Sequence, residues 1–381
     1  MKKCVIIPDS FKGTLSSAQI CQVVKEEALR FFPGTDVLAV PVADGGEGTV
    51  DCFLAAVPGE KVSVKAHGPF GEPVLGYYGR FGEEAVLEMA MFAGLSQAEG
   101  RENPELASTY GVGEAIRQAI LDGCTHILLG LGGSCTNDGG AGMAAALGYR
   151  FLDAAGESFV PTGGRLKDIA AISAGSLHNL EPLLCGIRFT AICDIDNPLC
   201  GPEGAAAVFA PQKGADAAMV ERLDAGLCHL AEVLERDLGI QTKTLPGAGA
   251  AGGMGAGVAA FLKGQLRPGI QAVLDQVKFE ELAVGADLVI TGEGRLDSQS
   301  LHGKAVIGVA ERAAAMGIPV VAIVGDVGKG ADEAYGRGVT AIQSISRRPV
   351  DFSISRKDSL ASLRAAAGDL FRLWRAAEKG R

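Results

Sequence analysis

Four segments of the sequence combine glycine with carboxylate side chains, and two of them also carry a cation. They are Asp9-Ser10-Phe11-Lys12-Gly13, Asp44-Gly45-Gly46-Glu47-Gly48, Gly292-Glu293-Gly294-Arg295-Leu296-Asp297 and Gly325-Asp326. Glycine lets the backbone approach a ligand closely, and carboxylates suit Mg²⁺, which usually keeps phosphate oxygens and water as further ligands. Lys12 and Arg295 could bind an anionic substrate or neutralise a transferred phosphoryl group.

Two further loops whose residues could bind a ligand or take part in catalysis lie in the middle of the chain. Residues 130–140 (Gly-Leu-Gly-Gly-Ser-Cys-Thr-Asn-Asp-Gly-Gly) follow a predicted strand and precede a predicted helix. In that context, backbone N–H groups and hydroxyls can hold a phosphate. Residues 193–198 carry Asp194 and Asp196, for which a metal ligand, a base and a simple turn before Pro198 remain alternatives.

Residues 247–252 match the G-x-G-x-x-G pattern of dinucleotide-binding loops, but they lack its context. The preceding segment ends in Leu245-Pro246, a poor strand end, and Arg267 stands where a ribose-binding acid would be expected. We therefore expect a close-packing or phosphate-contacting loop rather than an NAD site. The Walker A pattern, the protein-kinase signature set and the G-x-S-x-G elbow are absent from the sequence.

The elements that must position these loops alternate between strand and helix at both ends of the chain. Apolar runs predict strands at residues 4–7, 37–42, 288–291, 319–324 and 339–345. Ser16 and Gln19 form a capping-box pair at the start of a predicted helix after the first strand. Such alternation is typical of a parallel sheet, in which ligands bind beyond the carboxyl ends of the strands. One glycine loop could be an ordinary turn, but four at one edge predict a common site.

The middle of the chain has a different pattern. Residues 61–88 are β-rich and interrupted by glycine and proline, and residues 217–237 have the periodicity of an amphipathic helix. We therefore predict an α/β protein with two unequal α/β domains. A flavodoxin-like parallel-sheet domain is formed by both chain ends, residues 1–63 plus 283–381, and an inserted second α/β domain spans residues 64–282.

Composition excludes several other classes of protein. The 381 residues include 54 glycines, roughly twice the usual share, with 48% hydrophobic residues and a formal charge of −10. The apolar content excludes intrinsic disorder, and the acidic charge argues against a nucleic-acid partner. The apolar runs are shorter than the roughly 18–20 residues that a membrane span needs. Nine cysteines without a C-x-x-C pair indicate reduced thiols in a cytoplasmic protein.

Five of these motifs, in this order, resemble the motif series of the bacterial type-1 glycerate kinases. They occupy residues 8–13, 43–49, 132–140, 249–253 and 292–297, and Cys135 stands where the family usually has alanine. The resemblance covers essentially the whole chain. It implies a kinase that uses ATP as co-substrate and Mg²⁺ as cofactor to phosphorylate D-glycerate, in most members at the 2-hydroxyl, giving 2-phosphoglycerate and ADP. It also implies two unequal α/β domains with the site between them.

Within this hypothesis, residue type and loop position suggest a role for each site residue. The catalytic residues would be Lys12, Asp194, Arg295 and Asp297, with Asp194 or Asp297 accepting the hydroxyl proton. Glycerate would be bound by Asp9, Ser10, Lys12 and Arg295, and Mg²⁺ by Asp44, Glu47 and Glu293. The nucleotide phosphates would contact Gly132, Gly133, Ser134, Thr136, Asn137, Gly252, Gly253 and Gly255.

Three alternatives stay open at this point. The same kinase could act at the 3-hydroxyl to give 3-phosphoglycerate, because that choice depends on an ångström-scale pose. A nicotinamide-dependent hydroxy-acid oxidoreductase would need residues 247–252 at a strand–helix turn. A non-catalytic organic-acid sensor would leave the loop carboxylates unexplained, since without Mg²⁺ they would repel an anion. The expected partners are the small molecules glycerate and ATP, with no membrane or nucleic acid, and the oligomeric state is open, a homo-oligomer included.

Overall fold

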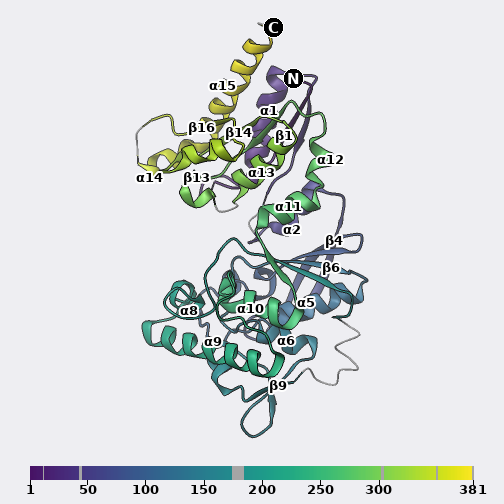
Figure 1. The fold of residues 1–381 in the computed structure, drawn as a ribbon, viewed down its shortest axis with the longest axis vertical. Coiled ribbons are helices and arrows are strands. Elements are labelled where there is room, and N and C mark those ends of the chain that lie inside the picture. Colours follow the sequence, from purple (N-terminus) through teal and green to yellow (C-terminus); the bar gives the residue numbers. More distant parts are fainter. Residues whose placement is uncertain (12, 43–44, 174–183, 302–303, 349–350, 380–381) are drawn as a thin grey trace. The chain divides into compact units, whose positions relative to one another are not determined.

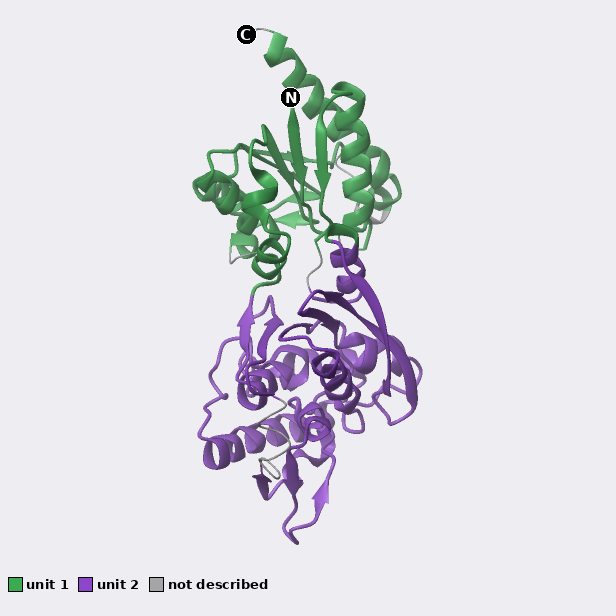
Figure 2. Ribbon diagram, turned by 90° about the vertical axis from the view of Figure 1, so that its right-hand side faces the viewer, with its two compact units in different colours: residues 1–43, 55–57, 268–381 green, residues 44–54, 58–267 purple. Residues whose placement is uncertain are grey.

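The computed structural model describes the chain except for residues 12, 43–44, 174–183, 302–303, 349–350 and 380–381. Lys12 and Asp44 therefore lie outside the described residues. The chain forms two compact units (Figure 2). Unit 1 comprises residues 1–43, 55–57 and 268–381, and unit 2 comprises residues 44–54 and 58–267. No helix in the described part of the chain is long and apolar enough to cross a membrane.

Unit 1 is built on a five-stranded sheet with the order β16-β14-β12-β1-β2 (Figure 1). The strands are β1 (Lys3–Ile6), β2 (Asp36–Ala39), β12 (Leu288–Thr291), β14 (Val320–Val324) and β16 (Ala341–Ser344). All neighbouring strands are parallel. Counted along unit 1, the order is 2-1-3-4-5, which is the flavodoxin-like arrangement. The predicted parallel sheet formed by both chain ends is thus confirmed.

Helices cover the sheet of unit 1 because its strands are apolar on both faces. Helices α1 (Ser17–Phe31) and α15 (Ser359–Lys379) pack against each other and share a core with alternate strand residues, among them Ile6, Ile290 and Ile323. Helix α13 (Ala305–Ala315) packs on β12 and β14, and α11 (Gly269–Gln276) and α12 (Phe279–Ala283) contact α13. The predicted capping box at Ser16 is present and fixes the start of α1.

The shorter elements of unit 1 lie in its loops. They are the parallel pair β13 (Arg295–Leu296) and β15 (Asp326–Val327), the helix α14 (Phe352–Ser355) and the 3-10 turns η3 (Ser298–Leu301), η4 (Ala331–Arg337) and η5 (Arg356–Asp358). Strands β13 and β15 follow β12 and β14, so they join the loops at the carboxyl ends of those two strands.

Unit 2 contains a mixed six-stranded sheet with the order β11-β10-β6-β5-β4-β3. The strands are β3 (Glu60–His67), β4 (Pro73–Phe81), β5 (Glu84–Glu88), β6 (His126–Gly130), β10 (Arg188–Ile192) and β11 (Gln265–Arg267). The β3–β4–β5 meander is antiparallel, whereas β5, β6, β10 and β11 are parallel. The loops after β6 and β10, which carry the predicted chemistry, therefore leave the same edge of the sheet.

The helices of unit 2 lie around this sheet, and most of them share one continuous apolar core with it. They are α2 (Thr49–Ala56), α3 (Ala90–Ala93), α4 (Leu95–Ala98), α5 (Tyr110–Leu121), α6 (Ala141–Leu147), α8 (Ala205–Phe209), α9 (Ala217–Leu238) and α10 (Ala250–Leu262). A small sheet of β7 (Arg150–Leu152), β8 (Ser158–Phe159) and β9 (Ala171–Ser173) and the 3-10 turns η1 (Gly163–Asp168) and η2 (Pro211–Lys213) complete the described part of the unit.

One cysteine pair departs from the prediction of reduced thiols. Cys200, which precedes α8, forms a disulfide with Cys228 of α9, with their Cα atoms 5.7 Å apart. The prediction is therefore wrong for this pair, because the two residues are 28 positions apart and meet only when α8 packs on α9. Cys4, Cys124, Cys135, Cys185 and Cys193 are free thiols.

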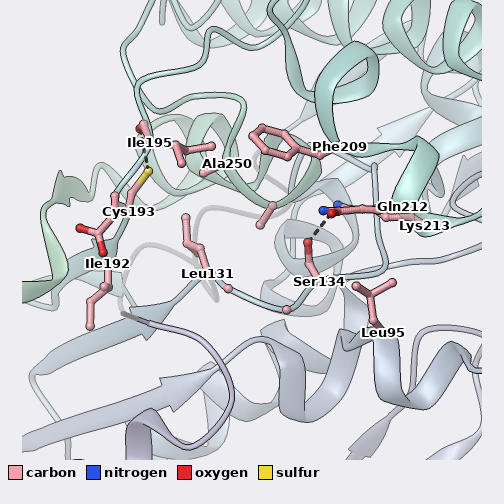
Figure 3. A pocket seen from close by; sticks show the side chains of 14 residues that line it. Leu95, Leu131, Ser134, Ile192, Cys193, Ile195, Phe209, Gln212, Lys213 and Ala250 are labelled. Atoms are coloured by element: carbon pink, nitrogen blue, oxygen red, sulfur yellow. Dashed lines mark hydrogen bonds between the residues drawn. The ribbon is translucent and has the colours of Figure 1, made fainter. Parts of the chain in front are cut away.

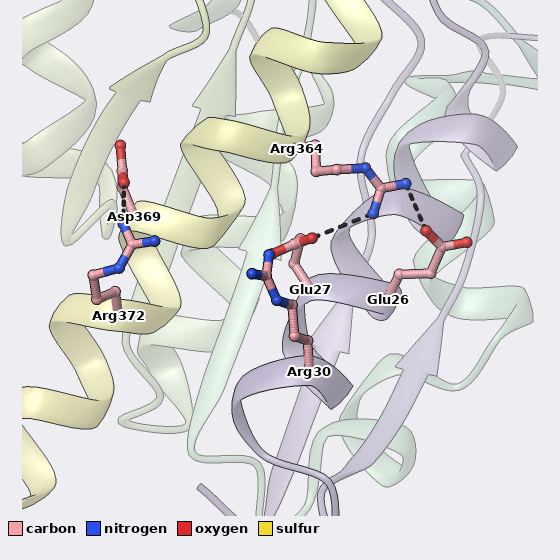
Figure 4. A network of polar contacts seen from close by, with 6 residues as sticks. All are labelled: Glu26, Glu27, Arg30, Arg364, Asp369 and Arg372. Atoms are coloured by element: carbon pink, nitrogen blue, oxygen red, sulfur yellow. Dashed lines mark hydrogen bonds and ion pairs between the residues drawn. The ribbon is translucent and has the colours of Figure 1, made fainter.

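A polar network joins the first and last helices of unit 1 (Figure 4). Arg364 of α15 donates hydrogen bonds to Glu26 (2.6 Å) and Glu27 (3.2 Å) of α1, and Arg30 also contacts Glu27 at 3.2 Å. The Glu27 side chain is only 3% exposed, so these arginines supply the polar contacts that it cannot make with water. The network thus supports the packing of the two chain ends.

We predict that Arg364→Met lowers the free energy of unfolding by about 1–2 kcal/mol, because the buried Glu27 loses one arginine partner. The control Arg348→Met removes an exposed ion pair with Asp358. It should change the free energy of unfolding by less than about 0.5 kcal/mol. Urea denaturation at neutral pH measures both. Equal effects of the two variants would contradict the role given to the network.

Candidate functional site

Three predicted loops of unit 1 are held together by their backbones at the carboxyl edge of its sheet. The Asp9 amide donates to the Gly292 carbonyl (2.8 Å), and the Gly325 amide donates to the Glu293 carbonyl (3.0 Å). A Cβ atom on Gly292 would lie 2.0 Å from the Ile323 carbonyl oxygen, which no side chain tolerates. Glycine is therefore required where these loops meet, and the carboxylates beside it are brought into one region.

Glu293 is a buried carboxylate of this region, and its pKa is raised. The residue is 5% exposed, and its Oε1 has no hydrogen-bond partner among the described residues. Burial raises the pKa of Glu293 to about 7, with repulsion from Asp9 and Asp297 adding to the effect and Ser300 and Lys304 opposing it. A buried, unpaired carboxylate oxygen is suited to hold a cation or a proton.

Arg295 and Asp297 lie beside Glu293 but are more exposed. The Arg295 guanidinium is 3.4 Å from the Asp297 carboxylate and 3.7 Å from that of Asp326. Asp297 also accepts a hydrogen bond from the amide of Gln299 (3.0 Å), which fixes it at the start of η3. The Arg295 side chain is 63% exposed, so it remains accessible to an anion.

The loop after β1 is described only in part, since Lys12 lies outside the described residues. Asp9 accepts a hydrogen bond from the amide of Ser10 at 2.6 Å, which shapes the loop into a tight turn. The structure thus brings Asp9, Glu293 and Asp297 together, with Arg295 paired to Asp297 and Ser10 next to Asp9 in the loop.

In unit 2, the loop that carries Glu47 packs directly on the loop after β6. The Gly132 amide donates to the Gly45 carbonyl (2.9 Å), and a Cβ on Gly130 would lie 2.4 Å from that same carbonyl oxygen. Glu47 itself is exposed and accepts a hydrogen bond from the Ser96 hydroxyl (3.1 Å). Two of the predicted motifs are therefore in contact, although more than eighty positions separate them in the chain.

Two buried carboxylates that the sequence did not single out hold these loops in place. Glu88, at the end of β5, accepts hydrogen bonds from the amides of Gly48 (3.1 Å) and Val50 (2.6 Å), and burial raises its pKa. Asp138 accepts from both the amide (2.7 Å) and the hydroxyl (2.9 Å) of Thr109. Both acids form the hydrogen bonds that the loop backbones would otherwise make with water.

The loops at residues 132–137 and 252–255 also meet. A Cβ on Gly252 would lie 2.0 Å from the Thr136 carbonyl oxygen, and the Gly252 carbonyl accepts from the Gly139 amide (3.0 Å). Gly252 and Gly253 have positive φ angles of 69° and 90°, at the irregular start of α10. The Thr136 hydroxyl and both amide atoms of Asn137 are buried without a hydrogen-bond partner among the described residues. Such groups are candidates to bind a ligand.

Residues 247–252 do not form a dinucleotide-binding turn. The chain from α9 to α10 contains no strand, and all of its residues are described. The strand–turn–helix context of that motif is therefore missing, as Leu245-Pro246 in the sequence predicts. Gly249 and Gly255 instead allow close packing, since a Cβ on either would lie within about 2.3 Å of a carbonyl oxygen.

A cavity of about 230 Å³ opens beside the loop after β6, and Asp194 is one of its lining residues (Figure 3). Lys213 lies at one side, 2% exposed, and donates hydrogen bonds to the Ser134 hydroxyl (2.9 Å) and the Thr136 carbonyl (2.7 Å). Burial lowers its pKa to about 8. The cavity is lined by Leu95, Leu131, Gly132, Gly133, Ser134, Ile192, Cys193, Asp194, Ile195, Phe209, Gln212, Lys213, Ala250 and Ala251.

Lys213 is the functional candidate that sequence reasoning missed. It belongs to no motif, and it becomes buried only because η2 folds over the loop that carries Ser134. No local pattern could mark it, since its hydrogen-bond partners Ser134 and Thr136 lie 79 and 77 positions away in the chain.

Clustered metal ligands are absent from the described residues, where no group of three or more His, Cys, Asp and Glu side chains could hold a metal ion. Mg²⁺ does not require such a cluster, because it usually binds one or two carboxylates together with phosphate oxygens and water. The buried, unpaired oxygen of Glu293 fits that chemistry.

The chain is similar to known proteins along nearly its whole length. Residues 4–375 match the sequence model of the glycerate kinase family. The chain is 42% identical to the glycerate kinase of Bacillus cereus, over 99% of each chain, and 43% identical to the glycerate 2-kinase of Escherichia coli, over 90% of each. It superposes on the crystal structure of a Salmonella typhimurium protein assigned as glycerate kinase 2 with a TM-score of 0.85, 40% identity and 99% coverage of both chains.

We predict that Glu293→Gln stabilises the protein more at pH 8 than at pH 5 when neither Mg²⁺ nor nucleotide is present. A carboxyl with a raised pKa favours folding while it is protonated, and this stabilisation is lost as the pH rises from about 4.5 through about 7. Glutamine stays neutral throughout, so the gain at pH 8 should be about 1–3 kcal/mol. Thermal unfolding at both pH values measures it.

The matched control is Glu333→Gln, which changes an exposed carboxylate of the same unit. Its effect should be small and equal at the two pH values. A Glu293→Gln variant that behaves like this control would show that the pKa of Glu293 is not raised.

Proposed function

The chain belongs to the glycerate kinase family and is a kinase, and we propose that it uses ATP and Mg²⁺ to phosphorylate D-glycerate at the 2-hydroxyl. The observation that carries this proposal is that the chain contains two kinds of loop suited to phosphoryl transfer, one kind in each unit. Unit 1 presents clustered carboxylates with an accessible arginine, and unit 2 presents a glycine loop with a buried lysine. Phosphoryl transfer depends mainly on positioning and charge neutralisation, and these loops offer both.

In unit 2, residues 132–137 and 252–255 hold the nucleotide phosphates. The phosphates contact Gly132, Gly133, Ser134, Thr136, Asn137, Gly252, Gly253 and Gly255, as the residue types suggest. The Thr136 hydroxyl and the Asn137 amide are buried without a hydrogen-bond partner among the described residues. They support this assignment, because a bound phosphate could accept hydrogen bonds from them. Lys213 adds a fixed positive charge behind Ser134.

The carboxylates that would serve as Mg²⁺ ligands are Glu293, Glu47 and Asp44. The buried Oε1 of Glu293 supports its part in this set. When bound, Mg²⁺ neutralises charge on the phosphate oxygens and orients them. Protonation of Glu293 competes with this role, so the enzyme needs a pH at which this carboxylate is ionised.

Glycerate is bound in unit 1 by Asp9, Ser10 and Arg295, together with Lys12. Arg295 remains exposed and can bind the substrate carboxylate through its fork of N–H donors. Asp297 and Asp194 are the two candidates to accept the hydroxyl proton. The position of Asp297 beside Arg295 and Glu293 favours Asp297, because a base must lie within hydrogen-bond reach of the bound substrate.

The product identifies the reaction. We predict that incubation with ATP, Mg²⁺ and D-glycerate yields 2-phosphoglycerate and ADP, as resolved by phosphorus NMR, and that EDTA stops the reaction. The name of the Escherichia coli relative supports the 2-position. Formation of 3-phosphoglycerate would correct the position alone, activity in EDTA would contradict the role of Mg²⁺, and no phosphoglycerate would overturn the proposal.

A second prediction tests the base. Asp297→Asn should lower kcat by about 10²–10⁴-fold, the usual contribution of general base catalysis, with a small change in the KM for glycerate. Asp194→Asn serves as the comparison. A large loss of kcat in Asp194→Asn alone would transfer the role to Asp194, and near-normal turnover in both variants would show that neither is the base.

A further inference from the structure

The cavity in unit 2 has two chemically different ends. One end is polar, with Gly132, Gly133 and Ser134 and the buried ammonium of Lys213. The other walls are mainly apolar, and they include the only aromatic ring of the lining, that of Phe209. Figure 3 shows the Phe209 ring extending into the cavity, while Gln212 and Lys213 reach toward Ser134. A ligand of this cavity must therefore combine an anionic group with an apolar body.

Glycerate does not have this combination. It carries a carboxylate and two hydroxyls on a short carbon chain, so apolar walls would leave its polar groups without partners. A nucleotide has both features, because its phosphates are anionic and its base presents flat faces that stack on aromatic rings. The volume of about 230 Å³ lies below the roughly 300–1,000 Å³ of sites that enclose whole drug-sized ligands. The cavity therefore suits one ring system with its first attached groups.

We propose that this cavity binds the base of the nucleotide, with Phe209 as the stacking wall, and that its polar end directs the phosphates toward Ser134 and Lys213. The proposal rests on the proposed kinase function and deepens it. It gives a role to Phe209, Gln212 and Lys213, which belong to none of the sequence motifs. Helix α8, which ends at Phe209, is preceded by Cys200, and the disulfide to Cys228 of α9 ties this segment to the body of unit 2.

The second charged group at the cavity is Asp194. It is the one carboxylate among the described lining residues, and it lies two positions after the end of β10. A carboxylate repels phosphates but can accept hydrogen bonds from sugar hydroxyls or share a cation with phosphate oxygens. The ammonium of Lys213, by contrast, is held by Ser134 and Thr136 in the loop assigned to the phosphates.

Steady-state kinetics with ATP and glycerate varied in turn test the proposal. Phe209→Ala should raise the KM for ATP about five- to a hundred-fold, the usual loss when a stacking ring is removed, with the KM for glycerate changed less than about two-fold. Phe209→Tyr should restore the KM for ATP, because it keeps the ring. The matched control is Val208→Ala, next to Phe209 on α8, exposed and absent from the cavity lining, which should alter neither constant.

A second variant keeps the test valid if Phe209→Ala fails to fold. Gln212 is exposed at the polar end, so Gln212→Glu should fold normally. Its added charge should weaken ATP binding by repelling the phosphates, and the effect should shrink in high salt. Normal ATP binding in both Gln212→Glu and a folded Phe209→Ala would overturn the proposal, as would a rise in the KM for glycerate alone.

Calorimetric titration with ATP in the absence of glycerate separates this proposal from the kinase function. If the wild type binds ATP, if this binding depends on Phe209 and if no phosphoglycerate forms, the nucleotide site is supported and the proposed reaction is contradicted. Wild type that forms phosphoglycerate but binds ATP equally well with and without the Phe209 ring would keep the reaction and place the base elsewhere.

Discussion

Direct contact between glycine backbones is the constraint on which both candidate sites depend. In unit 2, Gly130 and Gly132 lie against the backbone of Gly45 and Gly46, and Gly252 lies against Thr136, at distances that exclude a Cβ atom. In unit 1, Gly292 and Gly325 make the same kind of approach to neighbouring loops. Loops that pack this closely can present backbone N–H groups and carboxylates within one small region. The glycine content of the chain is thus partly a requirement of site construction.

Close packing removes loop backbones from water, and buried charged residues replace the hydrogen bonds that are lost. Loop backbones removed from water need partners, and Glu88 and Asp138 accept their hydrogen bonds, while Lys213 donates to the Ser134 hydroxyl and the Thr136 carbonyl. Each of these groups is costly to bury alone and stable only because several hydrogen bonds surround it. The same burial shifts the pKa values of Glu293 and Lys213 toward neutrality. Burial of charged groups beside the loops therefore both holds the loops in place and shifts pKa values.

The fold could be predicted from the sequence because its signals are local. Apolar runs of four or five residues mark β1, β12 and β14, and the Ser16–Gln19 pair marks the start of α1. Alternation of strand and helix then limits the topology to a parallel sheet, and connections between parallel strands have few allowed forms. The three glycine–carboxylate loops of unit 1 could be found in the same way, since they follow β1, β12 and β14. Their joint location follows from the parallel direction of these strands.

By itself, the sequence determined the α/β class, the pairing of the chain ends in one sheet and the loops that carry reactive side chains. Only the tertiary structure decided the rest. It buried Lys213 against Ser134, placed Phe209 in the wall of a cavity, anchored the Glu47 loop through Glu88 and joined Cys200 to Cys228. Secondary structure and turns depend on neighbours along the chain, which a sequence displays. Burial, pKa and cavity shape depend on residues that are distant in the chain and meet only when it folds.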